Sequence, residues 1–220
     1  MIVMRKALSC QALLVAFVIA VQAHASPIQI TVDTLLLAGV SADLAFDLTD
    51  GGPPPNTVTI SGFASNGTLG SASSNCDVTG CVTGSFLSFP GVVTIGDTGF
   101  FNEYLQNIIL GSFLTFSFDT TGNAADPGSS PDGFALYFLD PITGRPLFVT
   151  SDPQGGDALF HYSIGDANPL EVYGSDAVTV QATSNVVPEP SAYALVIAAL
   201  LAFGIVHALR QIKLRQRMRV

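Results

Sequence analysis

The sequence predicts an all-β domain, an antiparallel β-sandwich or jelly roll over residues 26–185, flanked by an N-terminal signal peptide and a C-terminal single transmembrane helix. Three observations support this fold class. Short stretches alternate apolar and polar residues, clusters of Gly, Pro, Asp and Asn separate these stretches, and both ends of the 220-residue chain carry apolar runs beside basic residues. Alternation with a period of two is typical of half-buried strands, and such clusters are typical of turns.

The first expected strand, at residues 28–33, alternates isoleucine and valine with glutamine, threonine and aspartate. Similar stretches follow at residues 44–48, 58–63, 113–118, 134–139, 159–164 and 177–182. Turns are expected at residues 50–55, 66–67, 126–128, 131–133 and 152–156, where Gly, Pro, Asn and Asp dominate. One short helix is expected at residues 100–109, because apolar residues recur there every three to four positions.

Phenylalanine is expected to supply much of the core of this domain. A chain of about 160 residues can bury a sufficient core. The expected core members are Phe46, Phe63, Phe86, Phe89, Phe113, Phe116, Phe118, Phe134 and Phe138. Aromatic residues can instead form an exposed platform that stacks against sugars, and this alternative stays open for Tyr104, Tyr137, Tyr162 and Tyr173.

The predicted domain is strongly acidic. Residues 26–185 contain sixteen acidic residues and one basic residue, Arg145, which gives a net charge near −15. Nucleic acid is excluded as a partner, because binding to a phosphate backbone requires a basic face. Such acidity suits solubility outside the cell or the binding of divalent cations.

Residues 1–25 have the pattern of a secretory signal peptide. Arg5 and Lys6 form the positive start, residues 12–21 form the apolar segment, and Ala23 and Ala25 define a small-x-small cleavage site before Ser26. The alternative is a retained N-terminal anchor, but the apolar run is short for a hydrocarbon core of about 30 Å.

The C-terminal region, residues 186–220, has three parts in a fixed order. The triplet Pro188, Glu189 and Pro190 comes first, and residues 192–209 follow without a formal charge apart from His207. Eighteen residues span about 27 Å as a helix, which is enough to cross a bilayer. Five basic residues within 210–219 complete the region and predict a cytoplasmic C-terminus: Arg210, Lys213, Arg215, Arg217 and Arg219.

This order of triplet, spanning helix and basic terminus resembles the PEP-CTERM sorting signal of exported proteins in Gram-negative bacteria. The resemblance implies recognition by an exosortase, a membrane protease-transpeptidase, which would cut near the triplet after transient anchoring. It also implies a final location at the cell surface or outside the cell, in an exopolysaccharide setting. A permanent single-span anchor is the alternative, and the two interpretations differ only in whether the chain is cleaved near the triplet.

The domain itself resembles a small group of exported PEP-CTERM proteins. The shared features are the strand Val32-Asp33-Thr34, the turn Gly51-Gly52-Pro53, and Asp97 followed by Phe101-Asn102-Glu103-Tyr104. This second resemblance supports the sorting interpretation and implies no catalytic residue.

Cys76 and Cys81 are expected to form a disulfide, since an exported domain folds in an oxidising compartment. The loop between them is short, so the bond is expected to contribute only about 2 kcal/mol through chain entropy. Two thiolates without a nearby histidine cannot complete a zinc site.

Few catalytic chemistries fit the domain. His161 is the one histidine within residues 26–185, no Gly-x-Ser-x-Gly motif is present, and no lysine is available for a Schiff base or a P-loop. A carboxylate pair for glycoside hydrolysis is one remaining chemistry. Calcium binding in a loop is the other, with Asp119, Asn123, Asp126 and Asp132 as ligands; the alternative is that these are solvated turn residues.

We therefore expect a non-enzymatic protein with no catalytic residues and no required cofactor. The expected function is that of an exported surface or extracellular-matrix protein, structural or adhesive, with an exosortase, the membrane and exopolysaccharide as partners. Two alternatives stay open: a carbohydrate-binding module, with or without calcium, and a glycan-active hydrolase.

Overall fold

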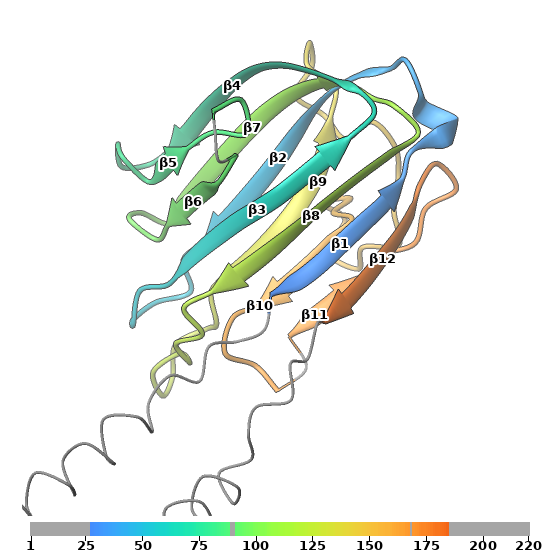
Figure 1. Cartoon of the computed structure of the whole chain (residues 1–220). Coiled ribbons are helices and arrows are strands. Elements are labelled where there is room, and N and C mark those ends of the chain that lie inside the picture. Colours follow the sequence, from blue (N-terminus) through green and yellow to red (C-terminus); the bar gives the residue numbers. More distant parts are fainter. Residues whose placement is uncertain (1–26, 89–90, 168, 185–220) are drawn as a thin grey trace, which may run out of the picture. The chain divides into compact units, whose positions relative to one another are not determined.

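The structure, a computed structural model, describes residues 27–88, 91–167 and 169–184 and contains two six-stranded antiparallel sheets (Figure 1). Sheet 1 has the order β12 (Thr179–Ser184), β1 (Ile28–Asp33), β8 (Phe113–Thr120), β3 (Thr57–Ser65), β6 (Val93–Gly96) and β5 (Val82–Gly84). Sheet 2 has the order β11 (Leu170–Val172), β10 (Phe160–Ser163), β9 (Gly133–Leu139), β2 (Ser41–Thr49), β7 (Phe101–Ile109) and β4 (Thr68–Cys76). A single 3₁₀ turn, η1 (Leu35–Leu37), is the only helical element of the described residues. The predicted β-sandwich is confirmed.

Each predicted strand coincides with an observed one, but the helix predicted at residues 100–109 is wrong. That segment is β7, which pairs with β2 on one side and with β4 on the other. Its inward-facing side chains, at every second position, are Asn102, Tyr104, Gln106 and Ile108, and all four are buried. Asn102 and Gln106 are polar, so the alternation of apolar and polar residues is not visible in the sequence. Strand pairing with β2 and β4 determines the β conformation of this segment.

The core lies between the two sheets and is rich in aromatic rings. Phe46 of β2 contacts Phe116 of β8 edge to face, with ring centres 5.3 Å apart, and Phe118 of β8 stacks on Phe160 of β10 at 5.7 Å. Such aromatic pairs stabilise a core beyond the area they bury. Because each pair joins one sheet to the other, the rings set how the two layers pack.

Most of the predicted core phenylalanines are buried, with one clear exception. Phe46, Phe116, Phe118, Phe134 and Phe138 are buried, while Phe63 and Phe86 pack partly buried against the core. Phe113 is wrong as a core residue: it is 40% exposed, because it faces outward on β8. Phe89 lies outside the described residues.

The tyrosines that remained open as a sugar platform do not form an exposed one. Tyr104 is only 2% exposed within the core, and Tyr173 is also buried. Tyr137 packs against Tyr173, Ala135 and Ala158 in a small apolar cluster on the outer side of sheet 2. Tyr162 is partly buried and packs edge to face against Phe118 of the core.

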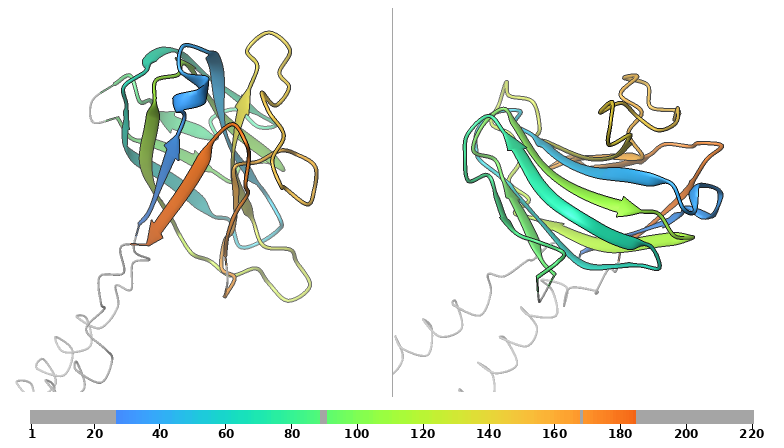
Figure 2. Two further views of the ribbon diagram at one scale, coloured as in Figure 1. Left: turned by 90° about the vertical axis from the view of Figure 1, so that its right-hand side faces the viewer. Right: turned by 90° about the horizontal axis from the view of Figure 1, so that it is seen from above.

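Both ends of the domain lie at one end of the sandwich. Ile28 of β1 is paired with Ser184 of β12, and Figure 2 (left view) shows these two strands side by side. The antiparallel register places the β2–β3, β6–β7 and β8–β9 loops at this end, which we call the terminal pole. The β1–β2 and β7–β8 connections lie at the opposite end, the distal pole.

One compact unit spans Ala25–Asn185. The predicted signal peptide, the sorting triplet, the spanning helix and the basic tail lie outside the described residues. Within the described part of the chain, no helix has the length and apolar character needed to cross a membrane.

Candidate functional site

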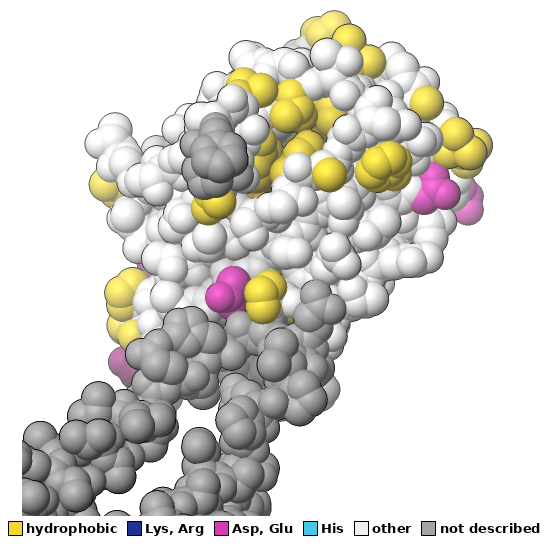
Figure 3. Space-filling view, in the orientation of Figure 1, with side chains coloured by type: hydrophobic (Ala, Val, Ile, Leu, Met, Phe, Trp, Pro, Cys, Tyr) yellow, Lys and Arg dark blue, Asp and Glu magenta, His cyan; other side chains and the backbone are white. Residues whose placement is uncertain are grey.

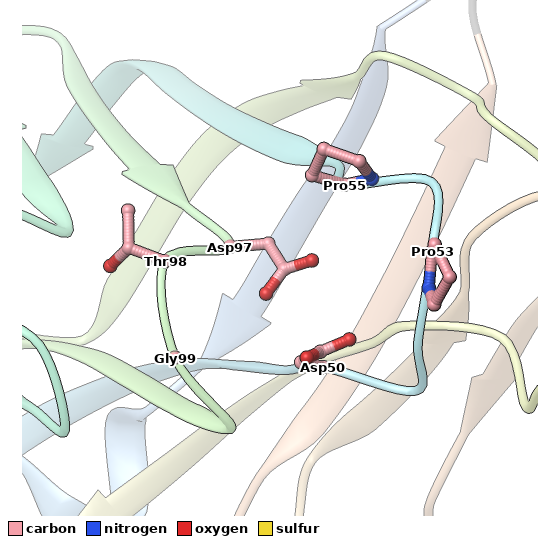
Figure 4. A pocket seen from close by; sticks show the side chains of 6 residues that line it. All are labelled: Asp50, Pro53, Pro55, Asp97, Thr98 and Gly99. Atoms are coloured by element: carbon pink, nitrogen blue, oxygen red, sulfur yellow. The ribbon is translucent and has the colours of Figure 1, made fainter.

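Three loops bring three aspartates together at the terminal pole. Asp50 follows β2, Asp97 lies between β6 and β7, and Asp132 precedes β9. One carboxylate oxygen of each lies within 4.8 Å of those of the other two. Figure 4 shows the side chains of Asp50 and Asp97 directed into the space beside Pro53 and Pro55. We call this set the aspartate cluster.

Asn56, at the end of the β2–β3 loop, fastens the three loops to one another. Its Nδ2 donates to Asp132 Oδ2 at 2.9 Å and to the backbone oxygen of Asn123 at 3.1 Å. Its Oδ1 accepts from Thr121 Oγ1 at 2.7 Å, and its backbone oxygen accepts from the Asp97 N–H at 3.0 Å. Because Asn56 is only 3% exposed, these bonds are shielded from water and hold the pole in one geometry.

Backbone amides and close glycine packing place two of the carboxylates. Asp132 Oδ1 accepts from the Gly51 N–H at 2.9 Å, and Asp50 Oδ1 accepts from the Gly52 N–H. A Cβ atom at Gly51 would collide with the backbone oxygens of Ser130 and Pro131, so this approach of the two loops requires glycine. The Gly-Gly-Pro turn therefore has a structural task at the cluster.

The aspartate cluster carries negative charge that no basic residue in the described part of the chain balances. Burial, followed by the charges of Asp50 and Asp132, raises the pKa of Asp97 to about 6. Arg145 is the only arginine or lysine among the described residues, and it lies in the β9–β10 loop. Three carboxylates that meet without a basic partner can hold a hard divalent cation, because Ca²⁺ binds oxygen ligands. A pocket of about 270 Å³, lined by Asp50, Asp97 and Thr98, adjoins them.

The calcium ligands predicted from the sequence are not brought together as a set; of the four, only Asp132 belongs to the cluster. Asp119 lies within β8, and its Oδ1 accepts from the Thr120 N–H at 2.9 Å. Asn123 donates its Nδ2 to the backbone oxygen of Pro55 at 2.9 Å, and Asp126 is exposed. Asp119 is therefore engaged within its strand, Asn123 joins two loops, and Asp126 faces solvent.

Asp50 and Asp97 were missed because they are far apart in sequence and neither lies in an aspartate-rich loop. The sequence offers one signal for this site, since the Gly51-Gly52-Pro53 turn and the motif that begins at Asp97 both belong to the expected resemblance. In the structure, the turn and Asp97 are neighbours around the same pocket.

A carboxyl pair lies on the outer face of sheet 2. Asp47 of β2 is directly opposite Glu103 of β7, and the Oδ1 atom of Asp47 is buried without a hydrogen-bond partner. Burial, followed by the charge of Glu103, raises the pKa of Asp47 to about 8, and burial also raises the pKa of Glu103. The two groups therefore share a proton near neutral pH.

This carboxyl pair does not have the geometry of a glycosidase. Asp47 and Glu103 are paired directly across neighbouring strands, close enough for the charge of Glu103 to raise the pKa of Asp47, whereas the two carboxyl groups of a glycosidase stand roughly 5–9 Å apart to admit the sugar or water. Burial and the charge of Asp47 raise the pKa of the neighbouring Tyr137 to about 12, so its hydroxyl stays protonated. The pair acts as a proton-binding element of the sheet.

The remaining predicted residues are placed as follows. Cys76 and Cys81 form a disulfide with a Cα–Cα distance of 6.3 Å, joining the end of β4 to the start of β5. His161 lies on β10 opposite Ala135 and Glu171, and its Nε2 packs against Gly133. Ala23, Ala25, Ser26 and the triplet Pro188-Glu189-Pro190 lie outside the described residues, as does the basic tail.

Comparison with known proteins adds no assignment: no protein-family model, no curated protein and no solved structure matches this chain.

Proposed function

We propose that this protein is an exported surface or extracellular-matrix protein, sorted through a C-terminal PEP-CTERM signal, whose β-sandwich has a structural or adhesive task. The observation that carries the proposal is the position of the domain within the chain. The strands begin at Ile28, just after the expected signal-peptide cut before Ser26, and end at Ser184, just before Pro188. Both expected cuts therefore fall outside the strands that the structure describes.

The location of the cuts supports processing without damage to the fold. β12, the last strand, is an edge strand and pairs with β1 over its whole length. A cut near Pro188 would leave this pairing and the core untouched. Removal of the tail would then leave an acidic sandwich with a disulfide, which suits an oxidising location outside the cell.

The partners that follow are an exosortase-type protease and, before processing, the membrane that holds residues 192–209. Exopolysaccharide is the partner of the mature domain in this proposal. The aspartate cluster favours a form of this proposal in which the domain binds exopolysaccharide with the help of calcium. Three carboxylates from three loops meet there without a basic residue.

Replacement of the triplet tests the sorting step. A variant with Pro188→Ala, Glu189→Ala and Pro190→Ala is expected to stay in the inner membrane at full length in the native host. A matched control with Val186→Ala and Val187→Ala changes the adjoining residues and is expected to be released like the wild type. Equal release of the triplet variant and the control would refute sorting through the triplet.

A further inference from the structure

We propose that the outer face of sheet 1 binds a neutral polysaccharide chain. This inference rests on the proposed function, because it names the ligand and the binding surface of an adhesive matrix protein. Three features support it: the composition of that face, the groove at its distal end and the distribution of charge over the domain.

The outward-facing side chains of sheet 1 are almost all uncharged hydrogen-bonding groups. They are Thr179, Gln181 and Thr183 on β12, Gln29 and Thr31 on β1, Thr115 and Ser117 on β8, Thr59 and Ser61 on β3, Thr94 on β6, and Thr83 on β5. Figure 3 looks onto this face, where uncharged polar groups and backbone cover much of the surface and hydrophobic side chains gather above its middle. The two carboxylates of the face, Asp33 and Asp119, lie towards its two ends.

The strand register arranges these groups in rows across the sheet. Thr31 is paired with Gln181 on one side and with Thr115 on the other, and a second row runs from Thr183 through Gln29. The hydroxyls of Thr31 and Thr115 lie 3.2 Å apart, and Thr115 also donates to a backbone oxygen. A hydroxyl can donate and accept, as can a side-chain amide, so the rows match the hydroxyl groups of a glycan.

A groove of about 470 Å³ lies at the distal end of this face, between β12, β1 and the start of β8. Phe113 and Leu35 supply exposed apolar surface, and Thr31, Gln181 and Asp33 supply polar groups. Asp33 Oδ1 accepts from the Leu35 N–H at 2.9 Å, which leaves its second oxygen to accept bonds from a ligand. An apolar wall with a few convergent polar groups is typical of a small-molecule subsite. One sugar ring, apolar on its face and polar at its rim, fits this composition.

The distribution of charge identifies the ligand as neutral. Sixteen acids against one base would repel an anionic polymer, and sheet 1 offers no cation on its outer face. Sheet 2 presents Asp43, Asp47, Glu103 and Glu171 outward, so the acidity of the two sheet faces is concentrated on the opposite side of the sandwich. The middle of the sheet 1 face also lacks the apolar surface that forms the centre of a protein interface.

The test is affinity electrophoresis of the full-length protein, solubilised in a detergent whose headgroup contains no sugar. Gels contain dextran, mannan or hydroxyethyl cellulose as neutral polysaccharides, or alginate as an anionic one. The wild type is expected to be retarded by at least one of the neutral polymers and not by alginate. Phe113→Ala is expected to weaken that binding about tenfold, because the contact between the exposed phenyl ring and the sugar is lost. Thr31→Val, which removes one hydroxyl and keeps the shape, is expected to weaken it several-fold.

Phe100→Ala is the matched control, because Phe100 is also an exposed phenylalanine but lies in the β6–β7 loop at the terminal pole. It is expected to bind like the wild type. Retardation by none of the neutral polymers would overturn the inference, as would binding that Phe113→Ala and Thr31→Val leave unchanged. Because this assay does not depend on processing of the tail, either of these results would leave the proposed sorting intact.

Discussion

Ile28, the first residue of the first strand, lies directly opposite Ser184, the last residue of the last strand. Six residue pairs join β1 and β12, so the two segments that lead to the terminal regions of the chain are held together within one sheet. The aspartate cluster lies at the same pole, because the β2–β3, β6–β7 and β8–β9 loops end there. The groove of sheet 1 lies at the opposite, distal pole, beside Asp33 and Phe113.

Calcium is expected to stabilise the protein through the aspartate cluster. Addition of millimolar calcium should raise the thermal midpoint by roughly 5 °C over a chelator-treated sample, since a ligand that binds only the folded state shifts the equilibrium. Asp97→Asn should abolish the increase. Asp126→Asn, a change of an exposed aspartate outside the cluster, should leave it intact. A midpoint that calcium does not change would rule out a calcium site.

The carboxyl pair on sheet 2 is expected to make stability fall as pH rises from about 4 to about 8. Over this range the carboxyl of Asp47 ionises in the unfolded chain but keeps its proton in the folded one. The folded state then binds more protons, so the free energy of unfolding decreases with pH, by at most about 1.4 kcal/mol per pH unit for one proton. Asp97, whose pKa is raised to about 6, acts in the same direction over the lower part of this range.

Urea unfolding of wild type and Asp47→Asn at pH 5 and pH 8 checks this expectation. The amide cannot ionise, so the variant should lose much less stability between the two pH values than the wild type. Asp176→Asn, an exposed position, serves as the control and should follow the wild type. If Asp47→Asn and the control show the same loss, the pair does not hold the proton.

Asn56→Ala is expected to destabilise the domain by about 2–4 kcal/mol, because it breaks several bonds of a buried side chain and leaves Asp132 Oδ2 without that donor. Asn66→Ala is the matched control. Asn66 also bonds through both side-chain atoms, to Ser112 and Phe113, but it lies exposed in the β3–β4 turn. Its loss should cost less than half as much in chemical denaturation. Equal costs would show that Asn56 does not fasten the pole.

Most strands with apolar inward positions could be predicted from the sequence; β6 is an exception, because with only four residues its two inward positions, Val93 and Ile95, are too few to show a period. In β1 the inward residues are Ile28, Ile30 and Val32, which make the alternation visible. β4 is built from Thr, Gly, Ser, Ala and Asn with a single leucine and a final cysteine, so it carries no apolar period, and it is a strand because β7 pairs with it. In β7 the buried Asn102 and Gln106 interrupt the alternation of apolar and polar residues, so the remaining apolar residues have the spacing of a helix.

The aspartate cluster could not be predicted, because antiparallel pairing creates it from three separate loops. Asp50 and Asp97 meet only because β2 and β7 are neighbours in sheet 2 and because Asn56 ties their loops together. A search for calcium ligands within one segment therefore selects Asp119, Asn123 and Asp126 together with Asp132, and only Asp132 belongs to the cluster. A single segment of sequence does not show which distant strands pair, and this pairing determines which loops meet.

The central claim, that the chain is exported and sorted through its C-terminal signal, is tested most directly by the intact mass of the protein recovered from its native host. Inner membrane, cell surface and medium are separated before the measurement. We predict a chain that begins at Ser26, ends between Pro188 and Ser191 and is found away from the inner membrane. A chain that still ends at Val220 in the inner membrane of a host with a working exosortase would contradict the account.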